Sequence, residues 1–202
     1  MNAIPASATS FLTETEIQSV GFKNVGENVK ISRKASIYNP ANITICNNVR
    51  IDDFCVLSPG DGFISIGNYV HIACHACLFG KGGILLSDFS GISSGCAVYS
   101  ATDDYLGEGL VGPTVPDEYR KLEVGCIVFK ELSVIGARSV ILPGVTLGEG
   151  TSVGALSLVN KNLDPWSIYF GVPARRIGIR LKKIQELKYA FLHAQKSYHS
   201  TP

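Results

Sequence analysis

The sequence predicts an all-β solenoid, and the first reason is a repeat of six residues. Seventeen apolar residues recur along the chain, and twelve of the sixteen steps between neighbours are six residues long. The residue four places into each of these twelve steps is Ala, Val, Cys, Ser or Thr. The apolar series is Ile31, Ile37, Ile45, Ile51, Leu57, Ile66, Ile72, Leu78, Leu86, Ile92, Val98, Phe129, Ile135, Ile141, Leu147, Val153 and Val159.

A six-residue unit of this kind builds a short strand followed by a tight corner. The aliphatic residue and the small residue alternate along the strand, so both point inward. Three such strands close a triangular coil of about 18 residues, and coils stack by parallel backbone pairing about 4.8 Å apart. A buried aliphatic contributes about 1.5–3 kcal/mol only where a neighbouring coil covers it, so such units occur in stacks.

The four irregular steps predict one enlarged corner. They run from Ile37 to Ile45, from Leu57 to Ile66, from Leu78 to Leu86 and from Val98 to Phe129. Three steps separate each from the next, so all four lie at the same corner, and the shorter three are rich in Pro, Gly and Asn, as turns should be. The last step spans 31 residues. It predicts a projecting loop over about residues 99–128 that opens with two aspartates and a tyrosine.

Helices are predicted at both ends of the solenoid. Thr13 and Glu16 form a capping-box pattern at the start of a short helix that Gly21 ends. Residues 181–195 carry apolar side chains at helical spacing and predict a C-terminal amphipathic helix. We therefore expect a helical extension over residues 1–28, the solenoid with its loop over 29–160, and a turn with a helix over 161–202.

Composition and charge narrow the class of protein. The 18 Lys and Arg residues nearly balance 17 Asp and Glu residues, which argues against a nucleic-acid partner. No apolar run is long enough for a membrane helix and no signal-peptide pattern opens the chain, so we expect a cytoplasmic protein without membrane insertion. At least four of the six cysteines stand at repeat positions, which favours reduced thiols.

Two local clusters have competing interpretations. The stretch HIACHAC (71–77) resembles a metal cluster, but no second Cys/His pair exists and the strand would turn these side chains to different faces, so we expect no metal. From Arg175 onward the chain holds seven Lys or Arg residues and one acid, Glu186. That basic end is either a solvated helix face or an anion site.

Two longer phrases carry a resemblance to a known family. VIGARSVILPGVTLGEGTSVGALSLV (134–159) and YFGVPAR (169–175) resemble the hexapeptide-repeat acyltransferases, which fold as left-handed parallel β-helices, act as trimers and use acyl-CoA. The handedness is implied by the resemblance alone, because crossovers between parallel strands are nearly always right-handed. KISRKASIYNPANITI, VRIDDFCVLS and YSATDDYLGE look like the bacterial enzymes that N-acylate dTDP-4-amino-4,6-dideoxyglucose for surface polysaccharides.

The resemblance implies an acetyl-CoA groove between adjacent subunits. It places Gly136, Ala137, Gly154 and Ala155 along the pantetheine arm, where small residues let the arm approach main-chain amides. Tight corners explain the same glycines without any ligand. The resemblance also places Pro173, Arg175 and Arg176 beside the CoA phosphates, which favours the anion-site interpretation of the basic end.

The loop carboxylates depart from a common pattern of the family, whose sugar O-acetyltransferases keep a histidine base in or beside the loop. None of the four histidines lies between residues 76 and 192. An amine needs a weaker base than a hydroxyl, so a carboxylate fits an amino-sugar acceptor. We expect Asp103 to be the general base, raised in pKa by Asp104 and by burial at an interface, with His71 as the rival. Further candidates for substrate contacts are Ser94, Asp104, Tyr105 and Lys121.

The resulting hypothesis is an acetyl-CoA-dependent N-acetyltransferase for a nucleotide-linked amino sugar, of the dTDP-4-amino-4,6-dideoxyglucose type, in O-antigen or surface polysaccharide synthesis. The alternatives are a sugar O-acetyltransferase of the same fold, a non-catalytic scaffold, and a zinc-dependent β-helix protein. The last lacks a ligand, because only His71 and His75 lie within the predicted coils.

Overall fold

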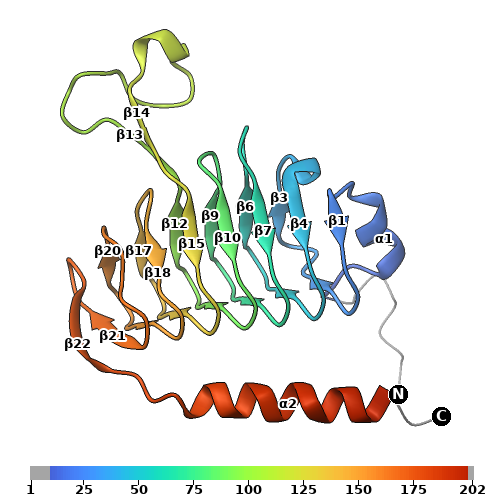
Figure 1. Cartoon of the computed structure of the whole chain (residues 1–202). Helices are drawn as coiled ribbons and strands as arrows, with labels where there is room; N and C mark the ends of the chain where they lie inside the picture. Colours follow the sequence, from blue (N-terminus) through green and yellow to red (C-terminus); the bar gives the residue numbers. More distant parts are fainter. Residues whose placement is uncertain (1–9, 200–202) are drawn as a thin grey trace, which may run out of the picture.

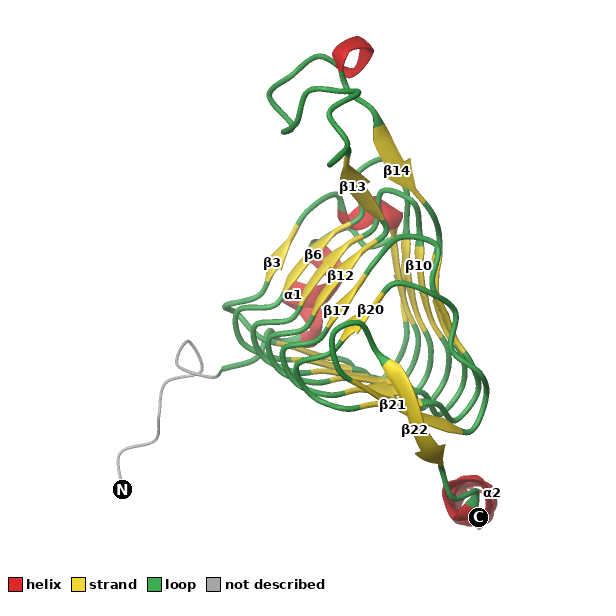
Figure 2. Cartoon of the chain, turned by 90° about the vertical axis from the view of Figure 1, so that its left-hand side faces the viewer, coloured by secondary structure: helices red, strands yellow, loops and turns green. Residues whose placement is uncertain are grey.

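The computed structural model describes residues 10–199 and confirms the all-β solenoid (Figure 1). The chain winds into triangular coils whose strands stack into three flat faces, seen end-on in Figure 2. Two faces have six strands and one has eight. Pairing between coils is parallel throughout the stacked triplets, as the repeat predicts.

Each face collects one strand from every coil. The first face holds, in order, β1 (Asn24–Val25), β4 (Ile43–Ile45), β7 (Ile64–Ile66), β10 (Ile84–Leu86), β15 (Ile127–Phe129) and β18 (Thr146–Leu147). The second face holds β2 (Lys30–Ile31), β5 (Arg50–Ile51), β8 (His71–Ile72), β11 (Gly91–Ile92), β16 (Val134–Ile135), β19 (Ser152–Val153), β21 (Ser167–Phe170) and β22 (Arg175–Ile179). The third face holds β3 (Ser36–Ile37), β6 (Val56–Ser58), β9 (Cys77–Phe79), β12 (Ala97–Tyr99), β17 (Val140–Ile141) and β20 (Leu158–Val159).

The core is the column of side chains inside the triangle, and the repeat predicts it closely. Sixteen of the seventeen apolar repeat residues are buried, and the exception is Ile37, which is half-buried in the terminal coil. Eleven of the twelve small residues are buried as well, with Ala35 of the same coil the exception. The two exceptions share one cause, because the terminal coil has a neighbour on one side only.

The enlarged corner lies between the third face and the first face, as predicted. It contains the short helix η2 (Pro40–Asn42) and the projecting loop, a ribbon of β13 (Ala101–Asp103) and β14 (Leu122–Val124) tipped by η3 (Asp117–Tyr119). The loop is slightly shorter than expected at both ends. Tyr99 still belongs to β12 and stacks on Phe79 at 5.1 Å between ring centroids, and β15 begins at Ile127.

The N-terminal cap follows the predicted chemistry. Helix α1 (Glu14–Ser19) begins after Thr13, whose side chain accepts from the Glu16 amide while the Glu16 side chain accepts from the Thr13 amide. Gly21 follows the helix with a φ of +85°, a conformation that glycine adopts without strain. The first face begins at β1, before the expected boundary at residue 29. Residues 1–9 of the expected N-terminal extension and 200–202 of the C-terminal segment lie outside the described residues.

The C-terminal segment contributes two strands that the repeat does not predict. β21 continues the second face in parallel, and β22 folds back on it in antiparallel order. Helix α2 (Lys183–His199) then runs back along the solenoid over the corner between the first and second faces (Figures 1 and 2). Phe191 packs edge-on against the rings of Tyr69 and Phe89, and Lys188 pairs with Glu131 at 2.6 Å.

Candidate functional site

The third corner, between the second and third faces, is the one that neither the loop nor α2 occupies (Figure 2). We call it the site edge, because most of the residues predicted to bind ligands lie on or beside it. Its segments, one per coil, are residues 32–35, 52–55, 73–76, 93–96, 136–139 and 154–157. Since adjacent coils are about 4.8 Å apart, these segments form one continuous line down the prism.

The C-terminal half of the site edge is made of small residues, and its glycines are required by coil stacking. A Cβ atom on Gly136 would lie 2.4 Å from the amide nitrogen of Ala155. A Cβ atom on Gly154 would lie 2.4 Å from the ring of Phe170. Tight contact within the chain therefore accounts for both glycines, and their presence alone is no evidence for a pantetheine arm. With Ala137 and Ala155 they leave a shallow surface of small side chains.

Pro173, Arg175 and Arg176 lie beyond that surface, at the end of the second face. The Val172–Pro173 peptide bond is cis and forms the turn between β21 and β22. Both arginines are exposed on β22, opposite Phe170 and Tyr169. Their guanidinium groups are therefore placed to meet an anion that reaches the C-terminal end of the site edge.

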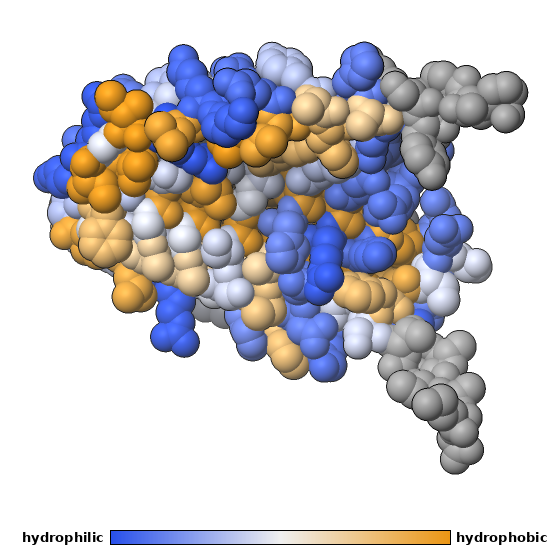
Figure 3. All heavy atoms as spheres, turned by 90° about the horizontal axis from the view of Figure 1, so that it is seen from below, coloured by the Kyte–Doolittle hydropathy of each residue, from blue (hydrophilic) through white to orange (hydrophobic). Residues whose placement is uncertain are grey.

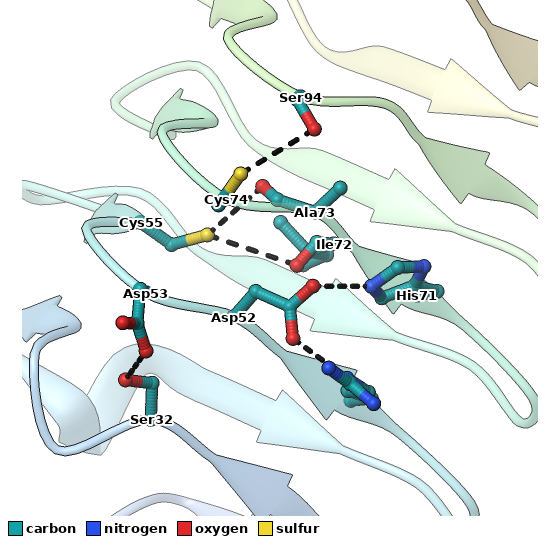
Figure 4. A network of polar contacts seen from close by, with 10 residues as sticks. Ser32, Asp52, Asp53, Cys55, His71, Ile72, Ala73, Cys74 and Ser94 are labelled. Atoms are coloured by element: carbon teal, nitrogen blue, oxygen red, sulfur yellow. Dashed lines mark hydrogen bonds and ion pairs between the residues drawn. The ribbon is translucent and has the colours of Figure 1, made fainter. Parts of the chain in front are cut away.

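The middle of the site edge joins two polar side chains from adjacent coils (Figure 4). The Cys74 thiol donates to the hydroxyl of Ser94 at 3.4 Å, and both residues are half-buried. Ser94 also accepts, through its carbonyl, from the amide of Arg138 in the next coil. The backbone of Ser94 is therefore fixed by the next coil, and its hydroxyl is contacted by Cys74, at the midpoint of the line.

His71 lies beside the site edge on the second face and belongs to an ordered pair. Asp52 accepts from His71 Nε2 at 2.7 Å and from Arg50 Nε at 2.6 Å (Figure 4). Burial opposes ionisation of Asp52, but these two hydrogen bonds outweigh it and hold the pKa of the carboxyl below its ordinary value. The carboxylate thus fixes the Nε2–H tautomer, which leaves Nδ1 as the basic nitrogen of His71.

The loop carboxylates are held by their own loop. Asp103 accepts from Arg120 at 3.0 Å and from the amide of Gly112 at 3.3 Å. Asp104 accepts from three backbone amides, those of Leu106, Glu108 and Gly109. These contacts order the loop, and each carboxylate keeps lone pairs that can accept further hydrogen bonds.

The two other loop candidates extend toward solvent. The Tyr105 side chain is 88% exposed, and Lys121 pairs with Glu108 at the surface.

One chain does not bring the predicted site residues together. The loop that carries Asp103, Asp104 and Tyr105 projects from the corner between the third and first faces, whereas Ser94 and His71 belong to the site edge and the second face (Figure 2). The two groups are therefore separated by a full face of the prism.

Three residues of the site were missed by the sequence interpretation. Asp52 and Arg50 orient His71, and Arg120 holds Asp103. For Asp52, the sequence offers one signal of a functional residue: two consecutive aspartates, 52 and 53, directly follow the repeat residue Ile51. Arg120 has no such signal, because its distance to Asp103 depends on the pairing of β13 with β14.

Among the described residues, no three His, Cys, Asp or Glu side chains gather as a metal site would need. In the same part of the chain, no helix has the length and apolar character required to cross a membrane. All six cysteines are unpaired thiols. Burial raises the pKa of the Cys55 thiol to about 11.

Comparison with known proteins adds independent findings. No protein-family model matches the sequence. The dTDP-4-amino-4,6-dideoxy-D-glucose acyltransferase of Escherichia coli is 44% identical over 182 residues, which cover 90% of this chain and 95% of that protein. A hexapeptide-repeat acetyltransferase of Vibrio cholerae, solved with acetyl-CoA, is 20% identical with a TM-score of 0.60 over 84% of this chain and 79% of its own. That likeness concerns the fold, and it confirms the predicted left-handed β-helix.

A second solved enzyme is much closer. The N-acyltransferase AntD of Bacillus cereus, in complex with dTDP and 3-hydroxybutyryl-CoA, is 49% identical with a TM-score of 0.89, over 93% of this chain and 99% of its own. Another form of it holds dTDP-4-amino-4,6-dideoxyglucose and CoA. Further forms carry replacements at one aspartate or at one serine, and those two positions lie ten residues apart.

Proposed function

This chain belongs to the dTDP-4-amino-4,6-dideoxyglucose acyltransferases of the hexapeptide-repeat group, and on that premise we propose that it acylates the amine of a dTDP-linked amino sugar. It is an N-acyltransferase with a CoA thioester as donor. The observation that carries this assignment is the 44% identity over 95% of the length of the Escherichia coli relative. The layout of the site edge supports it, with a cationic end, a run of small residues and an oriented polar centre.

For this reaction the protein must hold the amine beside the thioester carbonyl and supply a proton acceptor. The free amine attacks the thioester carbonyl, a C–N bond forms and the C–S bond breaks. The nitrogen gives up one proton, and the departing CoA thiolate gains one, so the products are an amide and the CoA thiol. A side chain that receives the nitrogen's proton contributes about 10²–10⁴-fold in rate.

The active site is completed, in this proposal, between subunits of a trimer. The loop and the site edge lie on different corners of one chain, so a loop from one subunit must lie beside the site edge of the next. An exposed apolar strip supports this assembly: the side chains of Ile177, Ile179 and Leu181 are 66%, 72% and 81% exposed at the end of the second face. Figure 3 shows apolar side chains gathered toward that end of the underside.

Asp103 is the proposed general base. Ser94 and Asp104 are the proposed contacts to the acceptor sugar. Only two serine–aspartate pairs in this sequence are ten residues apart, Ser93 with Asp103 and Ser94 with Asp104. Both pairs join the middle of the site edge to the start of the loop, which are the two parts that the trimer would bring together. The spacing of the replaced residues in AntD supports that juxtaposition. His71, oriented by Asp52, is the competing base, while Tyr105 and Lys121 contact the sugar nucleotide.

The donor occupies the C-terminal half of the site edge in the same proposal. Its pantetheine arm follows Gly136, Ala137, Gly154 and Ala155, and its phosphates meet Arg175 and Arg176 beside Pro173. We propose acetyl-CoA as the donor, a cytoplasmic location and a place in the synthesis of O-antigen or another surface polysaccharide. The relatives with bound CoA and dTDP support the substrate classes.

A product assay tests the assignment. The purified protein is incubated with acetyl-CoA or 3-hydroxybutyryl-CoA and a small set of dTDP-linked sugars that carry an amine or a hydroxyl at one carbon. Mass spectrometry should show an acyl adduct on the 4-amino sugar and none on its 4-hydroxy counterpart. Acylation of the hydroxyl compound alone would favour the O-acetyltransferase alternative, and the absence of any adduct would reject both.

A further inference from the structure

We propose that Arg120 is a positioning residue for the acyl transfer, which holds Asp103 so that one carboxylate oxygen stays available for the proton of the acceptor amine. The inference rests on the proposed function, in which Asp103 is the base. Three features of the projecting loop carry it: the burial of Arg120, the use of its hydrogen-bond donors, and the contrast between Asp103 and Asp104.

Arg120 is enclosed in a loop that is otherwise open to solvent. Its side chain is 14% exposed, whereas the loop residues Tyr105, Leu106 and Tyr119 are 88%, 85% and 61% exposed. Moving a guanidinium out of water is unfavourable unless acceptors replace the water around its donors. The burial of this cation therefore needs an explanation beyond the order of a surface loop.

The donors of Arg120 are used incompletely. Nη2 donates to Asp103 Oδ1 at 3.0 Å, and Nη1 donates to Asp117 Oδ1 at 3.2 Å. Within residues 10–199 the buried Nε–H has no acceptor. Buried donors are nearly always matched when a side chain is placed for stability alone. The unmatched Nε indicates that the position of the guanidinium is set by the carboxylate that it holds.

Other contacts already hold the hairpin together (Figure 1). β13 pairs with β14 over three residue pairs, and the Leu110 amide donates to the Tyr119 carbonyl at 2.8 Å. The side chain of Asp104 ties the start of the loop to three backbone amides. Since these contacts join the same segments, the effect of the Arg120 guanidinium falls mainly on the direction of the Asp103 side chain.

The two adjacent aspartates are held in different ways. Asp104 Oδ2 accepts from two amides, at 2.6 and 3.2 Å, and its Oδ1 accepts from a third, a pattern typical of a turn. Asp103 Oδ1 accepts from Arg120, and its Oδ2 accepts only from the Gly112 amide at 3.3 Å, just beyond the usual range of about 2.7–3.2 Å. Oδ2 of Asp103 is therefore the oxygen with the most room for a further donor.

This arrangement assigns separate tasks to the two oxygens of Asp103. In the proposed reaction an N–H bond of the attacking amine breaks and an O–H bond forms at Oδ2. Oδ1 keeps its hydrogen bond from Arg120 Nη2 throughout, because a neutral carboxyl group still accepts at its other oxygen. The carboxyl group is thus held in one direction while it changes charge.

Kinetics of two Arg120 variants test this role. Arg120→Gln removes the charged fork, so kcat should fall about 10–100-fold, the usual loss when a group that orients a reacting residue is removed. The KM of either substrate should change less than kcat, because Arg120 contacts neither substrate in this proposal. Arg120→Lys keeps the charge and one donor, and it should restore part of kcat.

A double variant separates positioning from a general effect on the loop. If Arg120 acts through Asp103, then Asp103→Asn with Arg120→Gln should have the kcat of Asp103→Asn alone, because the group to be positioned is already disabled. An Arg120 that only stabilises the loop would lower kcat by its own factor in both backgrounds. Should Arg120→Gln fail to assemble, Arg120→Lys alone and with Asp103→Asn gives the same comparison.

The matched control is a cation on the same enlarged corner. Lys81 pairs with Asp61 at 3.1 Å, so Lys81→Gln also removes the positive partner of an aspartate. It should leave kcat near wild type. Light scattering and thermal melting compare the assembly and fold of every variant with wild type. Calorimetry with CoA should give wild-type affinity in all of them.

The outcomes separate this inference from the proposed function. If the wild-type protein makes the N-acylated product while Arg120→Gln has normal kcat, or while its loss persists in the Asp103→Asn background, the positioning role is wrong and the function stands. A near-normal Asp103→Asn rejects the role as well, because no base remains to be positioned. If the wild-type protein forms no product, the proposed function fails. A loss that Arg120→Lys partly restores, and that disappears in the Asp103→Asn background, supports the role.

Discussion

At the scale of single residues, the contacts of a carboxylate decide what it is free to do. Asp103 accepts from Arg120 and from a backbone amide, and Asp52 accepts from Arg50 and His71. The first arrangement orders a loop and the second orders a histidine. Each supplies a proton acceptor that is fixed in space, Asp103 directly and Asp52 through His71 Nδ1.

Replacement of Asp103 tests which acceptor takes part. If Asp103 is the base, Asp103→Asn should lower kcat by roughly 10²–10⁴-fold with little effect on acetyl-CoA binding. The loss should shrink at high pH, where more of the amine arrives unprotonated, and His71→Asn should cost less. Steady-state kinetics across pH measures both variants.

Asp117 provides the matched control, because it pairs with the same Arg120 and its side chain is 82% exposed. Asp117→Asn should leave kcat near wild type. A near-normal Asp103→Asn together with an inactive His71→Asn would make histidine the base. Mild effects in both would mean that the amine needs no protein base.

The arginines of β22 allow a second test at this scale. Replacing Arg175 and Arg176 together with Gln should raise the KM for acetyl-CoA and leave the KM for the amino sugar nearly unchanged, because contacts to remote phosphates act on ground-state binding. Initial-rate measurements with each substrate varied in turn show the difference. An unchanged KM for acetyl-CoA would identify the two arginines as surface residues.

At the scale of elements, the helical cap of the solenoid has a pH-dependent contact. Glu16 accepts two hydrogen bonds from Arg33 of the first coil, at 2.8 and 2.7 Å, and the pKa of its carboxyl falls to about 2 mainly for that reason. A carboxyl with a depressed pKa stabilises the fold above its unfolded value of 4.5, and the stabilisation is lost as the pH falls toward 2.

Glu16→Gln should therefore lower the melting temperature at pH 7 by about 1–3 °C. The difference from wild type should close progressively below about pH 4.5, as the wild-type carboxylate itself becomes protonated. Glu14→Gln, in the same helical turn but without the arginine, should show no such closing. A Glu16→Gln deficit that persists at pH 2.5 would mean that the ion pair is not its source.

The elements also show where sequence reasoning reaches its limit. The buried column from Ile31 to Val159 is predictable because a fixed period brings every sixth residue back to the same side of the prism. The pairing of His71 with Asp52 is not predictable from the sequence. Corner insertions change the number of residues per coil, and thus which residues of adjacent coils lie side by side. The sequence does not predict β22 either. Arg175 and Arg176 come after the repeat has ended, and a strand that pairs in antiparallel order carries no hexapeptide pattern.

At the scale of the whole molecule, the separation of loop and site edge makes oligomerisation part of the chemistry. We expect a particle of about three times 21.6 kDa by light scattering. Ile179→Asp should dissociate it and abolish turnover, since Ile179 is 72% exposed in the single chain and a charge there should cost the isolated fold little. Tyr189→Asp, a 59% exposed site on α2, at the corner that carries neither the loop nor the site edge, should remain trimeric. A fully active monomer would contradict the shared site.

Mixed trimers sharpen the same prediction. If Asp103→Asn and His71→Asn each impair the enzyme, chains carrying one change each should regain activity when co-expressed, because some interfaces pair an intact loop with an intact edge. No recovery in mixed trimers would place both residues in a site within one chain.

Register between coils is set by hydrogen bonds on the flat faces, so residues added at the corner between the third and first faces leave the pairing of those faces intact. The entropy of closing a longer loop there grows only logarithmically with its length. Four insertions stand there one above another, three of two or three residues and one of 25. Such a solenoid can acquire new acceptor chemistry by lengthening or recasting one hairpin, while the column that makes it fold remains untouched.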